Sequence, residues 1–190
     1  MKRVNVSLWT ALVGLMGAAP ARATPAQVVM IRHAEKPAKG RDLDARGEER
    51  ARALVGFFET NPVVTRYGTP AAIYAAAPAD SNDSRRSVET VTPLAKSLGL
   101  EIDEDYTKDR VKEMVRNVMA NPAYEGRTVL ICWEHKRIPG MARQFGWASA
   151  PGKWSGKVFD RAWIIDFAGG RAVSFQDVPQ RLLPGDSSGE

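Results

Sequence analysis

The sequence has 190 residues, of which 44% are hydrophobic, 26% are charged and one is cysteine. This length suits a single domain with a sizeable core, and the hydrophobic content excludes a disordered chain. The lone cysteine excludes an internal disulfide framework. A net charge of +5 would indicate nucleic acid or anionic lipid as a partner only if the excess lay on the folded domain.

The N-terminal segment has the pattern of a secretory signal peptide. Two cations precede an apolar stretch at 8–19, which is too short for a stable membrane span, and a small-x-small cleavage site ends at Ala23. We predict that residues 1–23 are a signal peptide and that 24–190 form one periplasmic or secreted domain, with no membrane contact after cleavage. Cleavage would leave 24 basic against 22 acidic residues, which argues against a nucleic-acid partner.

Past the cleavage site, short apolar runs alternate with segments of helical periodicity. In chain order we expect a strand at 28–31, a helix through 51–58 capped by Asp44, a strand at 72–76, a helix at 88–98 kinked or restarted at Pro93, a helix at 111–119, a strand at 128–133, a helix at 139–145, and a hairpin of 159–167 with 171–175. Strands alternating with helices predict an α/β fold, a three-layer α/β/α sandwich with a mostly parallel central sheet.

Both histidines of the chain lie where a predicted strand ends. His33 comes two residues after the strand at 28–31 and is preceded by Arg32. His135 comes two residues after the strand at 128–133. Because ligands collect outside the carboxyl ends of parallel strands, we expect the two histidines to share one site.

A third element of this site precedes the helix at 88–98. The segment 83–87 follows the second strand and contains Arg86. A helix N-terminus offers free N–H groups and a positive dipole end, and a guanidinium group binds oxyanions with two hydrogen bonds. The sequence therefore predicts a site for a phosphate or carboxylate group.

At these positions the chain resembles the histidine phosphatase superfamily, which has the phosphoglycerate mutase-like fold. The Arg-His-Gly motif of that superfamily corresponds to the residues from Arg32 to Glu35, with Ala in place of Gly. The segment Leu43 to Ala51 matches the start of its first helix loosely, the segment Arg86 to Thr90 carries its second arginine, and His135 is its second histidine. The resemblance extends over about residues 27 to 146.

The resemblance implies a role for each of these side chains. His33 would be the nucleophile that forms a phosphohistidine. Arg32 and Arg86 would bind the nonbridging phosphate oxygens, and a cationic His135 would stabilise the charge that develops on them. The reaction would need no metal and no other cofactor.

The carboxylic acid that must protonate the leaving group has no clear match to the family pattern. Glu134, next to the second histidine, is our first candidate. Glu35, Glu113 and Asp83 remain as alternatives, although a salt bridge on a solvated helix suits Glu113 better.

The function expected from these residues is hydrolysis of phosphomonoesters, with a small phosphorylated molecule or a phosphopeptide as substrate. A phosphate-binding module without turnover, a phosphomutase and a metal-dependent hydrolase remain as alternatives. The segments 36–42, 77–84 and 143–157 are expected to shape the mouth of the site, and Lys36, Lys136 and Arg137 could extend it as a basic rim. The oligomeric state stays open.

Overall fold

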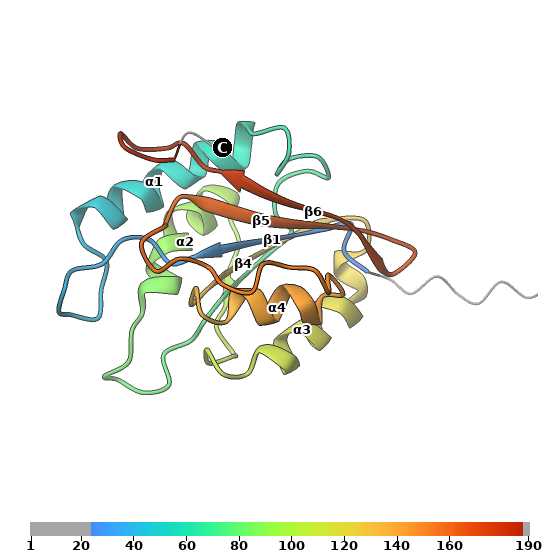
Figure 1. Ribbon diagram of the computed structural model, residues 1–190, viewed down its shortest axis with the longest axis horizontal. Coiled ribbons are helices and arrows are strands. Elements are labelled where there is room, and N and C mark those ends of the chain that lie inside the picture. Colours follow the sequence, from blue (N-terminus) through green and yellow to red (C-terminus); the bar gives the residue numbers. More distant parts are fainter. Residues whose placement is uncertain (1–23, 188–190) are drawn as a thin grey trace, which may run out of the picture.

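The computed structural model describes residues 24–187, so the predicted signal peptide lies outside the described residues. A six-stranded sheet carries helices on both faces (Figure 1). In chain order the elements are β1 (Gln27–Arg32), α1 (Ala45–Thr60), β2 (Ala72–Ala75), α2 (Arg86–Leu98), β3 (Ile102–Asp103), α3 (Val111–Ala120), the 3-10 turn η1 (Pro122–Tyr124), β4 (Thr128–Trp133), α4 (Ile138–Gln144), β5 (Arg161–Ala168) and β6 (Arg171–Pro179). All the predicted strands and helices are present, and the two-residue edge strand β3 is an addition to them.

The strand order β3-β2-β4-β1-β5-β6 confirms a sheet that is mostly parallel. The first four strands in this order run parallel, and the closing hairpin of β5 and β6 adds two antiparallel strands at one edge. β1 and β4 pair in register, so Arg32 lies opposite Trp133 at their ends. The amide of His33 donates to the carbonyl of Trp133 at 3.1 Å. The register therefore brings the segments that follow β1 and β4 together.

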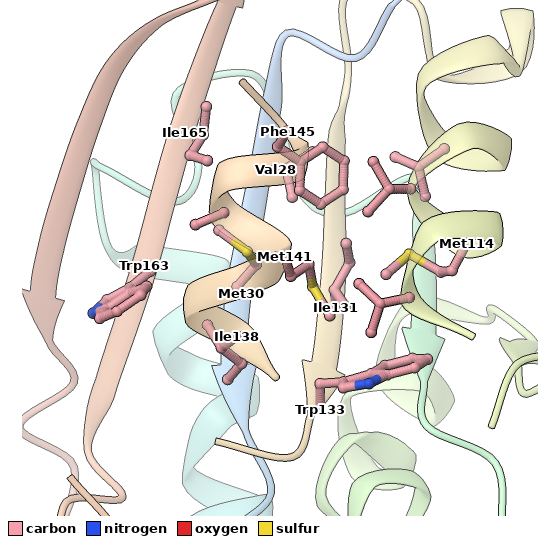
Figure 2. Packing of buried hydrophobic residues seen from close by; sticks show 14 of the residues in the cluster. Val28, Met30, Met114, Ile131, Trp133, Ile138, Met141, Phe145, Trp163 and Ile165 are labelled. Atoms are coloured by element: carbon pink, nitrogen blue, oxygen red, sulfur yellow. The ribbon is translucent and has the colours of Figure 1, made fainter. Parts of the chain in front are cut away.

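The three layers follow from alternating side chains on strands that are buried on both faces. Val28 and Met30 of β1 belong to the apolar cluster under α3 and α4, where Figure 2 shows them beside Met141 and Ile131. The alternate side chains of β1 pack into a second cluster with α1 and α2. Because both faces of β1 are covered, its sequence is continuously apolar rather than alternating.

Local sequence signals account for the helix ends. The Asp44 side chain caps α1 by accepting a hydrogen bond from the amide of Gly47 at 2.8 Å. Gly99 ends α2 in the left-handed conformation, with φ of 64°. α2 continues through Pro93 as one helix, so the predicted restart at this residue is wrong. Proline removes one backbone hydrogen bond, but the buried side chains on both sides of it keep the helix packed against the sheet.

The first turn of α1 lies directly against the segment that follows β1. A Cβ atom added to Gly47 would lie 2.3 Å from the carbonyl oxygen of Glu35. Only glycine allows the helix to approach this backbone so closely.

Within residues 24–187, no helix is long and apolar enough to cross a bilayer.

We expect Gly47→Ala to lower the free energy of unfolding by about 1–3 kcal/mol, because the new methyl group must displace the Glu35 backbone. Gly56→Ala in the same helix is the matched control, since no atom lies within 4 Å of its added Cβ. The control should stabilise the protein by about 0.5–1 kcal/mol, the ordinary gain of alanine over glycine in a helix. Urea unfolding of both variants measures the difference, and an equal effect of the two would contradict the close approach.

Candidate functional site

A cavity of about 290 Å³ lies where β1, β2 and β4 end, and we call it the strand-end cavity. All five side chains predicted to carry the site line it: Arg32, His33, Arg86, Glu134 and His135. They come from the last residue of β1, from the segments that follow β1 and β4, and from the first turn of α2. The structure thus brings together residues that are up to about a hundred positions apart in the sequence.

The ring of His33 is held in one tautomer. Its Nδ1 atom lies 2.8 Å from the carbonyl oxygen of Ala34, which can only accept a hydrogen bond. Nδ1 must therefore carry the proton, and in the neutral ring Nε2 keeps its lone pair. The amide of Ala34 in turn donates to the Thr90 hydroxyl at 2.9 Å, which fixes this segment against α2. The hydrogen bond thus directs the Nε2 lone pair of the neutral ring away from the Ala34 carbonyl.

Burial keeps the His33 imidazole neutral. Only 8% of the residue is exposed. Burial lowers the pKa of His33 to about 4, and the nearby charges of Arg32, Arg86 and His135 act in the same direction, against the hydrogen bond with Ala34. At neutral pH the lone pair on Nε2 is therefore free for a reaction.

Arg32 is a buried cation, with 2% of its surface exposed. Burial lowers its pKa to about 10, so it stays charged at neutral pH. Its Nη1 atom donates to the carbonyls of Val158 at 2.9 Å and Gly156 at 3.1 Å. The guanidinium carbon lies 3.7 Å from the ring centroid of Phe159. The protein thus surrounds the charge with carbonyl dipoles and an aromatic face.

Arg86 forms hydrogen bonds with the loop between β1 and α1. Its Nε atom donates to the Asp42 carbonyl at 3.2 Å, and its Nη2 atom donates to the Gly40 carbonyl. Arg86 is also the first residue of α2, where backbone N–H groups lack partners within the helix. The predicted mouth segments 36–42 and 77–84 both contribute to the cavity lining, through residues such as Lys36 and Ser84.

His135 lines the cavity opposite a glycine. A Cβ atom added to Gly156 would lie 3.4 Å from its Nε2 atom, and its Nδ1 atom is buried without a hydrogen-bond partner in the described chain. Burial, together with the charge of Arg32, lowers the pKa of His135. Burial and the Arg32 charge therefore favour a neutral ring in the absence of a ligand, whereas the predicted cation is the state with a bound phosphoryl group. A bound phosphate dianion would act in the opposite direction.

Two of the four candidate acids line the cavity. Asp83 accepts hydrogen bonds from the amides of Ser84 and Ala79 and forms an ion pair with Lys108 at 3.2 Å. These hydrogen bonds and the Lys108 charge lower the pKa of Asp83, which makes it a poor proton donor. Glu134 is half-buried, and the structure gives its carboxylate neither a hydrogen bond nor an ion pair within residues 24–187.

The other two candidates lie outside the cavity. Glu35 binds the buried guanidinium of Arg50, with Nη2 to Oε1 at 2.7 Å, and it also pairs with Arg46. Glu113 forms an ion pair with Arg110 on the surface of α3. Both carboxylates are thus engaged in ion pairs and do not line the cavity.

The lining of the cavity is strongly positive. Its cations are Arg32, Lys36, Arg86, Lys108 and Lys136, against the carboxylates of Asp83 and Glu134. Such a lining suits an anion. Among residues 24–187 there is no group of three or more His, Cys, Asp or Glu side chains that could hold a metal ion.

Sequence reasoning missed two parts of the site. Lys108 follows the unpredicted strand β3, and no motif marks it. The loop 155–159, which contacts Arg32, was expected only to shape the mouth or to begin the hairpin. Arg137, expected at the basic rim, instead pairs with Asp109.

No family model matches the sequence, and no curated protein sequence matches it significantly. Solved structures do match. Phosphoglycerate mutase from Bacillus anthracis superposes with a TM-score of 0.57 at 12% identity, over 83% of this chain and 94% of the mutase. The protein histidine phosphatase SixA, solved with tungstate, gives a TM-score of 0.53 at 10% identity, over 81% of this chain and 97% of SixA. The chain has the phosphoglycerate mutase-like fold. The resemblance drawn from the sequence is confirmed at the level of the fold.

In this phosphoglycerate mutase-like chain we expect acid to destabilise the folded state through His33. The unfolded chain binds a proton on His33 near pH 6.5 and the folded chain only near pH 4, so stability present above pH 6.5 is lost as the pH falls to 4. The loss is on the order of 3 kcal/mol. Urea unfolding at pH 7 and pH 4 measures it, with His33→Gln as the control that lacks this group. Equal losses in wild type and control would contradict a buried, neutral His33.

Proposed function

We propose that the protein is a phosphatase that hydrolyses phosphomonoesters through a phosphohistidine on His33. The observation that carries this proposal is the neutral His33, held in one tautomer inside a cavity that also contains two arginines. A neutral nucleophile among cations fits attack on a phosphate dianion, because the cations attract the anion and the lone pair remains free. The fold shared with a mutase and a protein histidine phosphatase supports the same chemistry.

In the first step, the Nε2 lone pair of His33 attacks phosphorus, and the bond from phosphorus to the leaving oxygen breaks. Arg32 and Arg86 bind nonbridging oxygens, whose charge is redistributed in the transition state. The leaving alkoxide takes a proton from a carboxylic acid. We assign this role to Glu134, since it lines the cavity without an ion pair in the described chain.

In the second step, water attacks the phosphohistidine. The Glu134 carboxylate, formed in the first step, takes a proton from the water, and the bond between Nε2 and phosphorus breaks. Inorganic phosphate leaves, and His33 returns to its neutral form with the proton still on Nδ1. His135 stabilises the charge on the phosphoryl oxygens in both steps.

The substrate we propose is a small phosphorylated molecule or a phosphopeptide that carries further negative charge. Lys36 and Lys136 are exposed at the cavity, and neither forms an ion pair within residues 24–187. Their charges add to those that bind the transferred phosphate and would favour an anionic group beside it.

We also propose that the protein acts in the periplasm or outside the cell. The proposal depends on the signal-like pattern of residues 1–23 alone. N-terminal sequencing of the mature protein checks it, and a mature chain that begins at Met1 would contradict export by cleavage.

We expect the wild type to hydrolyse p-nitrophenyl phosphate with EDTA present. His33→Ala should reduce turnover by at least 10³-fold, because it removes the nucleophile. With a radiolabelled substrate and a base quench, label should remain on wild-type protein and be absent from His33→Ala.

The other outcomes separate the alternatives. Activity that EDTA abolishes would favour a metal-dependent hydrolase. Tungstate binding without turnover of any phosphomonoester would favour a binding module. Label retained on His33→Ala would contradict the assignment of the nucleophile.

Glu134→Gln should lower turnover of alkyl phosphates by about 10²–10⁴-fold, because an alkoxide leaves poorly without a proton. Formation of the phosphohistidine from p-nitrophenyl phosphate should change much less, since nitrophenolate needs no proton to leave. The control is Asp83→Asn, which changes another carboxylate that lines the cavity. Pre-steady-state kinetics on both substrates measure the difference. If Asp83→Asn slows the reaction of alkyl phosphates more than that of p-nitrophenyl phosphate, and Glu134→Gln slows both equally, the acid is Asp83 instead.

A further inference from the structure

The loop 155–159, between α4 and β5, contacts three of the side chains that line the strand-end cavity. Its carbonyls accept hydrogen bonds from Nη1 of Arg32, and Gly156 lies against Nε2 of His135. Its last residue, Phe159, contacts both Arg32 and His33. The proposed function gives this loop no role, although its contacts converge on the proposed chemistry.

Phe159 presents a different part of its ring to each partner. The ring face lies against the guanidinium carbon of Arg32, 3.7 Å from the centroid. The ring of His33 lies 6.2 Å away, centroid to centroid, at an interplanar angle of 61°, which is an edge contact. One aromatic side chain thus restricts the orientation of both the phosphate-binding arginine and the proposed nucleophile.

Phe159 is not explained as a core residue. It is half-buried, and neither of the two apolar clusters that flank the sheet includes it. Its ring contacts are with the guanidinium of Arg32 and the imidazole of His33. Removal of the ring should therefore cost the core little.

Arg32 depends on this loop because its own neighbourhood offers few other partners. Nη1 is bound by the loop carbonyls, whereas Nε is buried with no acceptor in the described chain. A desolvated guanidinium group gains more from an aromatic face than an exposed one does. Without the ring, only the hydrogen bonds of Nη1 would hold the guanidinium plane, so the direction of its Nη2 atom would be less restricted.

We propose that Phe159 is a positioning residue, which aims the Arg32 guanidinium at the transferred phosphate and shields the His33 ring from water. This inference deepens the proposed function and depends on it for the identity of the phosphate.

The test compares Phe159→Leu with Phe159→Tyr, which keeps the ring face, in the full chain. Phe175→Leu is the matched control, because Phe175 is also half-buried and has aromatic contacts, but these are with Trp147 and Trp163 rather than with Arg32 and His33. We expect Phe159→Leu to weaken tungstate binding and to lower kcat/KM by about 3- to 30-fold, the range for loss of one cation–π contact. Phe159→Tyr should retain most of the tungstate affinity and most of kcat/KM. Phe175→Leu should change neither the tungstate affinity nor kcat/KM.

A second measurement distinguishes positioning from a loss of stability. The chain has only two histidines, so the NMR titration of His33 can be followed once His135→Ala has identified its signal. In Phe159→Leu the pKa of His33 should rise from about 4 toward 6.5 as water reaches the ring, while urea unfolding changes little. An unchanged titration, with tungstate affinity equal to that of Phe175→Leu, would overturn the proposal. Absence of turnover in the wild type would contradict only the proposed function, because tungstate binding and the titration still test the positioning.

Discussion

The charge of Arg32, buried at the end of a central strand, is the constraint on which the site depends. A guanidinium ion with 2% exposure must find its solvation within the protein. The 155–159 loop supplies it through backbone carbonyls and the face of Phe159. The loop is thereby held against side chains that line the cavity, namely Arg32, His33 and His135. The same buried charge helps to lower the pKa of the adjacent His33 and so favours the neutral form of its ring.

A second buried guanidinium, that of Arg50, stabilises the segment that follows β1. Arg50 donates to both carboxylate oxygens of Glu35 and to both of Asp186. Burial opposes ionisation of Asp186, but the hydrogen bonds from Arg50 and from two backbone amides lower its pKa to about 2. The network ties the loop after β1, helix α1 and the C-terminal segment together. It also explains why Gly47 is needed, since α1 must approach the Glu35 backbone for Arg50 to reach the Glu35 carboxylate.

The fold could be predicted from the sequence where burial leaves a pattern. The strands at 28–31 and 128–133 are continuously apolar because helices cover both faces of the sheet, and the position of the two histidines after them indicated a shared site. β3 has only two residues at a sheet edge, too short for any periodicity. Lys108 follows it and was missed for that reason.

The parts of the site that depend on tertiary contacts left no such pattern. The 155–159 loop binds Arg32 through backbone carbonyls, which any sequence possesses. The sequence left four carboxylates as candidate acids. The ion pairs of Glu35 with Arg50 and of Asp83 with Lys108 join residues that only the fold brings together. The pair of Glu113 with Arg110 is local to α3. The lowered pKa of His135 also depends on tertiary contacts, namely its burial and the charge of Arg32 at the end of the neighbouring strand.

The two histidines differ in how they can respond to a bound phosphate. Nδ1 of His33 already donates to the Ala34 carbonyl, so only Nε2, with its lone pair, is available to the anion. Nδ1 of His135 has no partner in the described chain, and its pKa is lowered by burial and by a neighbouring cation, which a phosphate dianion would offset. Arrival of the substrate would thus favour protonation of His135 while His33 keeps its fixed tautomer. The backbone carbonyl of Ala34 is thus what suits two identical side chains to the two different roles that we propose for them.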